Sequence, residues 1–423
     1  MTSPGGEAAR NILQRRKKKK RGGPQGRRSE AGPPRSGGGK ARWKTIKVVF
    51  TCGGTAGHVN PALALAGLIK ERKPNSEILF VGARRGIEKQ LIEAAGWPFR
   101  AVEISSFHRS LRPKEIKHNM ISLRNLLRAP REAKALLEEF PADLVVGTGG
   151  YASYPMIRAA DRLGIPCAIH ESNAIPGLTT RLLENHTDLI MVGFEECRKN
   201  YKHPDKVMVT GTPVRGDFFL LTRKEAKRKL GVDDGRPLIV SFFGSLGAEE
   251  MNREMAQFLA LEVKNGLPFH HVHGAGAIGC RHMSGYLAEA GMDLSRTPEL
   301  EVREYIQNMC ELMRAADLVI CRAGASTISE LTALGVPAII IPSPNVTHNH
   351  QESNARVLSD AGGALLVLEK DSSGQLLYDE ACRILRDEDR RRNMSAAMAS
   401  LGNIDASEKI YGAVMALRRP TGK

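Results

Sequence analysis

The chain has 423 residues, of which 42% are hydrophobic and 26% are charged. These proportions are typical of a folded protein and exclude a mostly disordered chain. The length predicts about two domains, and no apolar stretch reaches the roughly 18 residues that would predict a membrane-spanning helix. The seven cysteines are scattered and form no CxxC pair, so neither a disulfide framework nor a zinc ribbon is expected, and a reducing, cytosolic compartment fits best.

The positive charge is concentrated at the beginning of the chain. Residues 1–44 contain 14 Lys and Arg and two acids, so they carry +12 of the formal net charge of +16. Segment 1–43 has too few apolar residues to form a core and is predicted to be a disordered basic tail. An electrostatic tether to anionic lipid, non-specific nucleic-acid binding and a dispensable extension remain open for it. The basic run Arg15–Arg21 has no interleaved aromatic residue, which argues against a base-stacking platform.

From Thr45 onward, short apolar runs alternate with segments of helical periodicity. This repeated strand–turn–helix unit predicts a parallel sheet that is covered by helices on both faces. The expected strands of the first half are Ile46–Cys52, Glu77–Gly82, Asp143–Thr148, Pro166–His170 and Asp188–Val192, and the expected helices are Pro61–Lys70, Glu88–Ala95, Ser153–Leu163 and Gly177–Glu184.

A second series of the same kind begins after Gly211-Thr212-Pro213. The fold class is therefore α/β, with two Rossmann-like, doubly wound parallel-sheet domains and a ligand expected in the cleft between them. The expected strands are Leu238–Phe243, His270–Gly274, Glu301–Tyr305, Asp317–Cys321, Pro337–Ile341 and Gly363–Leu368, and the expected helices are Glu249–Glu262, Ser326–Leu334, Asn349–Ser359 and the end of the chain.

Four glycine-rich turns follow predicted strands: Gly53–His58, Gly147–Ser153, Gly244–Ala248 and Gly324–Thr327. Glycine lets the backbone turn tightly and approach a ligand, and the helix N-terminus that follows favours an anion. The Gly53–His58 turn does not have the GxGxxG pattern and lacks a GK[ST] ending, which disfavours a nicotinamide cofactor and a Walker-type site there. One such turn has a structural explanation, but four across two domains predict a phosphorylated or diphosphate ligand.

Two side chains near these turns are candidates for chemistry. Glu330 could accept hydrogen bonds from the vicinal hydroxyls of a ribose, or it could be an acid favoured by the helix dipole. His58 could take a proton from an attacking hydroxyl, or it could simply pack at a helix N-terminus. His170–Asn173 follows a strand and is expected to reach the cleft as well. The histidine clusters at 270–273 and 348–350 have no acid or Cys at ligand spacing, so no metal site is expected.

Seven segments together resemble the MurG glycosyltransferases, which transfer N-acetylglucosamine (GlcNAc) from UDP-GlcNAc to lipid I and so make lipid II, the peptidoglycan precursor. The resemblance covers residues 45 to 420, and the segments occur in the family's order. They are GGTAGHVNPALALA (53–66), GTGGYASYP (147–155), HESNAIPG (170–177), GTPVR (211–215), GSLGA (244–248), CRAGASTISEL (321–331) and HQESNA (350–355).

The resemblance implies the GT-B fold, with no cofactor and no catalytic metal. It implies an N-terminal domain at 44–215 that faces lipid I and a C-terminal domain at 216–400 that holds UDP-GlcNAc. A C-terminal helix at 401–423 is expected to return to the N-terminal domain. The tail 1–43 lies outside the resemblance.

The resemblance also implies roles for matching residues. Ser245 and the turn that contains Ala325, Ser326 and Thr327 would contact the diphosphate, Glu330 the ribose, and backbone groups of Ile306 the uracil. Gln351 and Asn354 would read the sugar hydroxyls. Further donor contacts are expected from Thr55, Gly57, Asn173 and Arg215, and the turn residues Gly53, Gly54, Gly149, Gly150 and Tyr151 would serve the acceptor or its diphosphate.

His58 would be the base for the C4 hydroxyl of the acceptor sugar. The implied reaction is a single displacement with inversion, and the charge that develops on UDP would be met by backbone N–H groups and a helix N-terminus. The sequence departs from the family pattern at Leu246 and His350, where many members have Gln, so some contacts to the donor are expected to differ.

Because the acceptor is lipid-linked, the protein is expected to bind peripherally to an anionic membrane surface, at the cytoplasmic face of the plasma membrane. Phe107–Leu137 combines eight Lys and Arg residues with apolar ones and is the candidate for this contact, although a solvated helix packed on the sheet is an equal alternative. Other cell-wall synthesis proteins are further partners that the resemblance admits, and no specific nucleic acid is expected.

Two other functions stay open. One is a different GT-B enzyme, such as a diacylglycerol glucosyltransferase or a UDP-GlcNAc 2-epimerase, which the segments HESNAIPG and HQESNA disfavour. The other is a non-enzymatic nucleic-acid-binding or scaffold protein, which is weakened because the residues after 44 carry a net charge of only +4.

Overall fold

The computed structural model describes residues 45–84, 86–104, 128–292, 297, 300–346 and 349–417. The predicted tail 1–43 and most of the basic segment 107–137 lie outside these residues. The described chain forms two compact units. The first contains the residues up to Glu171, Pro176–Thr210 and the residues from Asp405 onward, and the second contains Ser172–Ile175 and Gly211–Ile404.

The first unit is built on a seven-stranded parallel sheet with the order β3-β2-β1-β4-β5-β6-β7. Thr51 at the end of β1 pairs with Gly147 at the end of β4, so the turns that follow these two strands begin side by side. The strands are β1 (Lys47–Thr51), β2 (Glu77–Ala83), β3 (Phe99–Val102), β4 (Leu144–Gly147), β5 (Cys167–Glu171), β6 (Leu189–Val192) and β7 (Val207–Val209).

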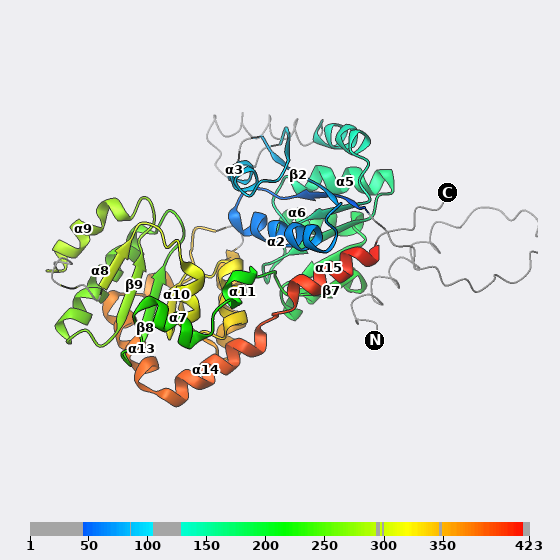
Figure 1. Ribbon diagram of the computed structural model, residues 1–423. Coiled ribbons are helices and arrows are strands. Elements are labelled where there is room, and N and C mark those ends of the chain that lie inside the picture. Colours follow the sequence, from blue (N-terminus) through cyan, green and yellow to red (C-terminus); the bar gives the residue numbers. More distant parts are fainter. Residues whose placement is uncertain are drawn as a thin grey trace, which may run out of the picture. The chain divides into compact units, whose positions relative to one another are not determined.

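Helices cover both faces of this sheet because its central strands are apolar on both sides. In β1, Val48 and Phe50 pack with one helical layer, whereas Val49 between them packs with the other. Figure 1 shows α15 (red) beside α2 (blue), although they come from opposite ends of the described chain. The helices are α2 (Ala56–Arg72), α3 (Ile87–Ala94), residues 128–139, α5 (Ser153–Leu163), α6 (Leu178–Leu183) and α15 (Ala406–Leu417).

The second unit is built on a six-stranded parallel sheet with the order β10-β9-β8-β11-β12-β13. Cys321 at the end of β11 pairs with Phe242 at the end of β8, so here too the turns after the two central strands start next to each other. The strands are β8 (Leu238–Phe242), β9 (His270–Gly274), β10 (Leu300–Arg303), β11 (Leu318–Cys321), β12 (Ala338–Ile340) and β13 (Ala364–Leu366).

The helices of the second unit bury an aliphatic core against this sheet, with Ile239, Ile320 and Ile339 of three adjacent strands fully enclosed. The first helix starts at a capping box, in which the Thr222 hydroxyl and the Glu225 carboxylate satisfy each other's backbone N–H groups. The helices are α7 (Arg223–Leu230), α8 (Glu249–Lys264), α9 (Cys280–Glu289), α10 (Met309–Ala315), α11 (Ala325–Leu334), α12 (His350–Asp360), α13 (Gly374–Arg386) and α14 (Glu388–Leu401).

The predicted fold class of two Rossmann-like, doubly wound parallel-sheet domains is confirmed. Short edge strands β3 and β7 were not predicted. Among the described residues, no helix combines the length and hydrophobicity needed to cross a bilayer.

Candidate active site

The first candidate residue, His58, lies in the first turn of α2, directly after the Gly53–Gly54 turn. Its Nδ1 is 2.7 Å from the carbonyl oxygen of Gly53 and 3.3 Å from the hydroxyl of Thr55. Because a carbonyl can only accept, Nδ1 carries the proton in this arrangement. The other ring nitrogen, Nε2, is therefore the one that can accept a proton.

The turn after β4 packs directly on this histidine. A Cβ atom at Gly149, whose φ is +107°, would lie 2.6 Å from Cδ2 of His58, so only glycine leaves room for the imidazole. A Cβ atom at the neighbouring Gly150 would lie 2.1 Å from the carbonyl oxygen of Gly53. The Thr148 hydroxyl donates to the His58 carbonyl over 2.6 Å. The first two glycine-rich turns therefore form one closely packed block around His58.

The second unit contains a cavity of about 570 Å³ at the carboxyl ends of its strands. Residues of the turn after β8 and of the turn after β11 line it together, as the register of these strands requires. Of the predicted donor contacts, Thr327 and Gln351 line this cavity, and the Gln351 side-chain carbonyl accepts from the Ser343 N–H at 2.9 Å.

The N-terminus of α11 is suited to binding an anion. Its N-cap residue is Gly324, so no side chain occupies the first N–H groups of the helix. The Ser326 hydroxyl oxygen is buried there, and no hydrogen-bond partner is found for it among the described residues. Buried polar atoms are normally paired, so an unpaired hydroxyl at a helix N-terminus indicates a ligand position.

One cation at this cavity had no role in the sequence analysis. Arg322 forms an ion pair with Glu369 and donates to the carbonyls of Ile341 and Pro342 at 3.1 and 3.2 Å. It therefore joins the ends of β11 and β12 to the short 3-10 helix Glu369–Asp371. The only sequence signal was its place directly before the Gly324 turn.

Glu330 lies on α11, one helical turn beyond Ser326, and has an unusual acidity. Burial raises its pKa from 4.5 to about 7, the charge of Arg215 opposes this shift, and Asp217 adds to it. Arg215 is held by the carboxylate of Asp217 at 3.3 Å and by the sulfur of Cys310 at 2.9 Å. The structure thus brings Glu330 and Arg215 into one electrostatic cluster.

Hydrogen bonds among buried polar side chains fix the backbone against which the turn after β8 packs. Asn252 of α8 donates to the Ala275 carbonyl at 2.9 Å, and the Ala275 carbonyl in turn lies where a Cβ of Gly247 would be. The Oδ1 atom of Asn252 accepts from Nε2 of His273 at 3.1 Å. This series of hydrogen bonds fixes the backbone that Gly247 packs against, and it explains why the turn needs glycine at φ +83°.

The histidines of β9 are thus structural. His273 and His271 both bond to the Ser241 hydroxyl, at 2.7 and 2.8 Å, and His271 also meets the Glu262 carboxylate at 3.1 Å. Burial, reinforced by His271, lowers the pKa of His273 to about 3, and burial raises the pKa of Glu262. Within the described part of the chain, no three His, Cys, Asp or Glu side chains are grouped so that they could hold a metal ion.

Further predicted donor contacts lie in other surroundings. The side chain of Asn354 is fully buried, and both ends of its amide bond protein groups, among them Asn173. The side chain of Ile306 is buried against Gly274, after the end of β10. Ser245 is exposed in the turn after β8. Its carbonyl accepts from the Ala277 N–H at 3.0 Å.

The HESN segment contributes structurally as well. Glu171 is buried and accepts from the Gly177 N–H at 3.0 Å and from the Thr180 hydroxyl at 2.7 Å, so it fixes the start of α6.

Thr55 is exposed at the mouth of the first turn, and Tyr151 stands over Gly54. The block around His58 therefore contains the predicted turn residues Gly53, Gly54, Gly149, Gly150 and Tyr151.

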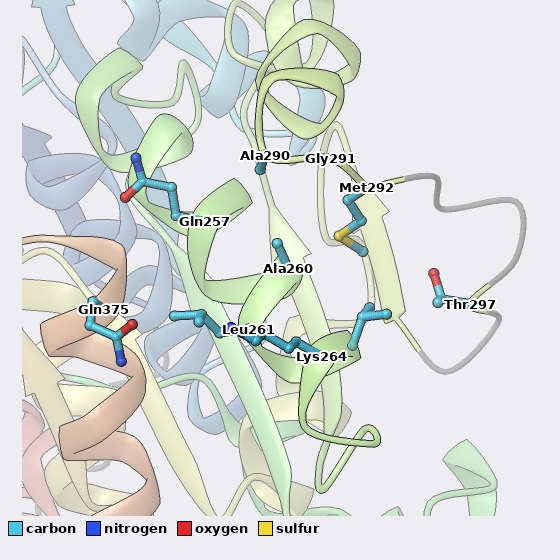
Figure 2. A pocket seen from close by; sticks show the side chains of 10 residues that line it. Gln257, Ala260, Leu261, Lys264, Ala290, Gly291, Met292, Thr297 and Gln375 are labelled. Atoms are coloured by element: carbon cyan, nitrogen blue, oxygen red, sulfur yellow. The ribbon is translucent and has the colours of Figure 1, made fainter.

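A larger cavity of about 710 Å³ lies elsewhere in the second unit (Figure 2). It is lined by the C-terminal half of α8 and by residues near the ends of α9 and α13, mostly aliphatic, with Lys264 as its one cation among the described lining residues. Because α8 runs back along the sheet, this cavity is not at the carboxyl ends of the strands, where ligands of such sheets bind. We therefore place the candidate site at the smaller cavity.

Comparison with known proteins identifies the family of both units. The model of the glycosyltransferase family 28 N-terminal domain matches residues 48–192, and that of the family 28 C-terminal domain matches residues 238–410. Fold and sequence thus define a two-domain glycosyltransferase architecture.

The most informative relatives are curated full-length proteins. A UDP-N-acetylglucosamine--N-acetylmuramyl-(pentapeptide) pyrophosphoryl-undecaprenol N-acetylglucosamine transferase from Acetivibrio thermocellus is 39% identical over 366 residues, covering 86% of this chain and 96% of its own. The protein of the same name from Ruminiclostridium cellulolyticum is 37% identical over 366 residues, covering 86% and 98%. The chain belongs to this family, the MurG glycosyltransferases.

Solved structures show the same fold. MurG from Acinetobacter baumannii superposes with a TM-score of 0.69 at 24% identity and covers 88% of this chain and 99% of its own. A putative UDP-N-acetylglucosamine 2-epimerase from Listeria monocytogenes superposes with a TM-score of 0.59 at 16% identity and covers 86% and 95%. At these identities, the likeness shows the shared GT-B architecture.

Proposed function

We propose that the protein transfers GlcNAc from UDP-GlcNAc to the C4 hydroxyl of the muramyl sugar in lipid I, which yields lipid II and UDP. The observation that carries the donor assignment is the uncapped N-terminus of α11, with the unpaired Ser326 hydroxyl and Glu330 on the same helix. The acceptor assignment follows the names of the relatives, which are 37–39% identical over most of their length.

In the proposed reaction, Nε2 of His58 takes the proton of the C4 hydroxyl while the oxygen attacks the anomeric carbon of GlcNAc. The bond from that carbon to the UDP oxygen breaks with inversion, and UDP leaves with the bonding electrons. His58 suits this role because its Nδ1 proton is already held by the Gly53 carbonyl at 2.7 Å. Gly149 keeps the ring in place from the other side.

The second unit would hold the donor. The first N–H groups of α11 and the Ser326 hydroxyl would meet the negative charge that grows on the diphosphate as the bond breaks. Glu330 would bind the ribose hydroxyls, and Gln351 at the cavity wall would contact the sugar. The uracil contact of Ile306 and the donor contacts of Arg215, Ser245, Thr55 and Gly57 remain part of this proposal.

Because lipid I is membrane-bound, we also propose peripheral association with an anionic membrane surface at its cytoplasmic face. The basic segment 107–137 supports this by its composition. Only its last part, residues 128–137, lies within the described chain, where Arg128 and Arg131 are exposed on a helix.

The deciding experiment measures UDP release from UDP-GlcNAc with and without a short-chain, soluble lipid I analogue. We expect acceptor-dependent release and a disaccharide product, and His58→Ala should lower kcat by roughly 10²–10⁴-fold. UDP release without acceptor, or formation of a 2-epimer from the donor alone, would instead favour an epimerase. A His58→Ala variant with near-normal kcat would refute His58 as the base. Residues 44–423 alone should turn over like the full chain if the tail has no part in the chemistry.

A further inference from the structure

A buried carboxylate lies beneath the turn that precedes His58. Glu88, in the first turn of α3, has no exposed surface. Its Oε1 accepts from the Ala83 N–H at 3.0 Å, and its Oε2 accepts from the Gly54 N–H at 3.3 Å. Burial of an ionised carboxylate costs free energy unless the carboxylate accepts hydrogen bonds. Here both donors are backbone N–H groups of neighbouring turns.

Three glycines make room for this carboxylate. A Cβ atom would lie 3.0 Å from Oε1 at Gly53, 2.8 Å from Cγ at Gly82 and 2.1 Å from Oε2 at Gly86. The φ of Gly86 is −170°, an extended conformation that other residues adopt easily, so its lack of a side chain is explained by space and not by backbone strain. The chain is thus shaped around the Glu88 side chain on three sides.

One peptide group forms hydrogen bonds to both the Glu88 carboxylate and the His58 ring. The N–H of Gly54 and the C=O of Gly53 belong to a single planar peptide unit. Its N–H donates to Glu88, and its C=O accepts the Nδ1 proton of His58 at 2.7 Å. Carboxylate, peptide and imidazole therefore form a continuous hydrogen-bonded series in which each bond polarises the next.

We propose that Glu88 is a positioning residue for His58 that acts through the Gly53–Gly54 peptide group. The carboxylate fixes the orientation of this peptide and so fixes the histidine tautomer that leaves Nε2 as the base. When Nε2 takes the proton of the acceptor hydroxyl, the oriented carbonyl and the anion behind it stabilise the imidazolium. The logic is that of a carboxylate–histidine pair, with one peptide group inserted between the partners. The inference rests on the proposed role of His58.

The other titratable groups at this turn do not supply a competing anion. Burial, with a contribution from the charge of Glu88, raises the pKa of the Cys52 thiol to about 12. The same two causes raise the pKa of the Tyr151 hydroxyl. Both groups are therefore protonated at neutral pH, and Glu88 is the acid in hydrogen-bond contact with the turn.

The test is a double-mutant cycle on kcat, measured with the soluble acceptor analogue. Glu88→Gln keeps the shape of the side chain but turns one acceptor atom into a donor that faces an N–H group. We expect this change to lower kcat by about 10-fold in the wild-type background and by less than about 2-fold in the His58→Ala background, because its effect passes through the imidazole. The KM for UDP-GlcNAc should stay within about 2-fold, since most of the proposed donor contacts lie in the other unit.

A second variant moves the carboxylate without removing it. Gly86→Ala places a methyl group 2.1 Å from the present position of Oε2 and should produce the same loss of kcat, so the proposal can be tested even if Glu88→Gln folds poorly. Glu93→Gln is the matched control, because Glu93 lies on the same helix, is exposed and forms a distant ion pair with Lys89 at 3.9 Å. It should leave kcat unchanged.

The possible outcomes separate the two proposals. Equal losses from Glu88→Gln in both backgrounds, or no loss in the wild-type background, would overturn the role of Glu88 and leave His58 as the base. A His58→Ala variant of normal activity would instead overturn the proposed function of His58. Nitrogen NMR of labelled histidine adds a direct readout: we expect His58 to be protonated at Nδ1 in the wild type and to lose this preference in Gly86→Ala. An unchanged tautomer in that variant would also contradict the proposal.

Discussion

The buried amide nitrogen of Asn354 donates to the side-chain oxygen of Asn173, which precedes it by 181 positions in the chain, over 3.2 Å. The same amide accepts from the Ala174 N–H at 2.8 Å and donates to the Ala323 carbonyl at 3.2 Å. The short segment Ser172–Ile175 is thereby fixed within the second unit, although the residues on either side of it belong to the first.

We expect Asn354→Ala to destabilise the second unit by about 2–4 kcal/mol, because it leaves buried backbone groups of Ala174 and Ala323 unpaired. Urea unfolding followed by circular dichroism measures this loss. Asn265→Ala is a suitable control, since that amide is exposed and bonds one carbonyl of its own helix, that of Leu261. A loss for Asn354→Ala no larger than for the control would show that the amide network is not stabilising.

The raised pKa of Glu330 predicts that the stability of the free protein and its affinity for UDP change with pH in opposite directions. Its pKa is raised from 4.5 to about 7, so the free protein loses the stability contribution of this group as pH rises between these values. Glu330→Gln should therefore make the ligand-free protein more stable at pH 8, by on the order of 1–2 kcal/mol.

The affinity for UDP should change with pH in the opposite direction to the stability of the free protein. The ionised carboxylate is the better acceptor for ribose hydroxyls, so affinity should increase as pH rises through about 7 and should be weaker and flat with pH in Glu330→Gln. Thermal unfolding and calorimetric titration with UDP across pH 5.5–8.5 check both parts (about three units around the pKa). Unaltered UDP affinity in the variant would contradict the ribose assignment.

Gly149→Ala should lower kcat by about 100-fold or more, because its methyl group would displace the His58 ring. Gly96→Ala is the matched control: its φ is also positive, at +78°, but nothing lies within 4 Å of the added atom. The control should lose only about 1 kcal/mol of stability and keep its kcat. If both variants have the same kcat, the close packing of Gly149 on His58 has no catalytic importance.

Charge reversal at Arg124 and Arg128 should weaken binding to anionic vesicles more than it slows turnover of a soluble acceptor analogue. Arg124 lies outside the described residues, and Arg128 is exposed on a helix. Each cation near an anionic surface contributes roughly 1 kcal/mol, so two reversals should reduce vesicle binding by more than about 10-fold. Reversal of the exposed Arg383 and Arg392 of the second unit serves as the control. Equal losses in both assays would count against a membrane role.

The main architecture was predictable because both sheets are parallel and buried on two faces. Strands such as Leu144–Gly147 are continuous apolar runs, and each is followed by glycine and a helix, which leaves little ambiguity. The edge strands β3 and β7 were missed because they are short and partly exposed, as Arg100 and Ala101 show, and so have no buried run.

The candidate site was predictable where a local pattern carries it. The turns at Gly53 and Gly324 were found because glycine after a strand is a local signal. Glu88 and Arg322 were not, because their partners are set by tertiary packing: Glu88 meets a turn 34 residues earlier, and nothing near it in sequence announces that contact. Asn354 was predicted to read the donor sugar, and its buried bonds to backbone could only be seen in the folded chain.

The packing of α15 also bears on how the chain folds during synthesis. Ile410, Ala413, Val414 and Leu417 of this helix complete the same core as Val48 and Phe50 of β1. Everything that builds the second unit is synthesised between these two parts. The unit that begins first on the ribosome therefore acquires its full core last, and we expect its nascent form to remain protease-sensitive until residues 405–417 have left the exit tunnel.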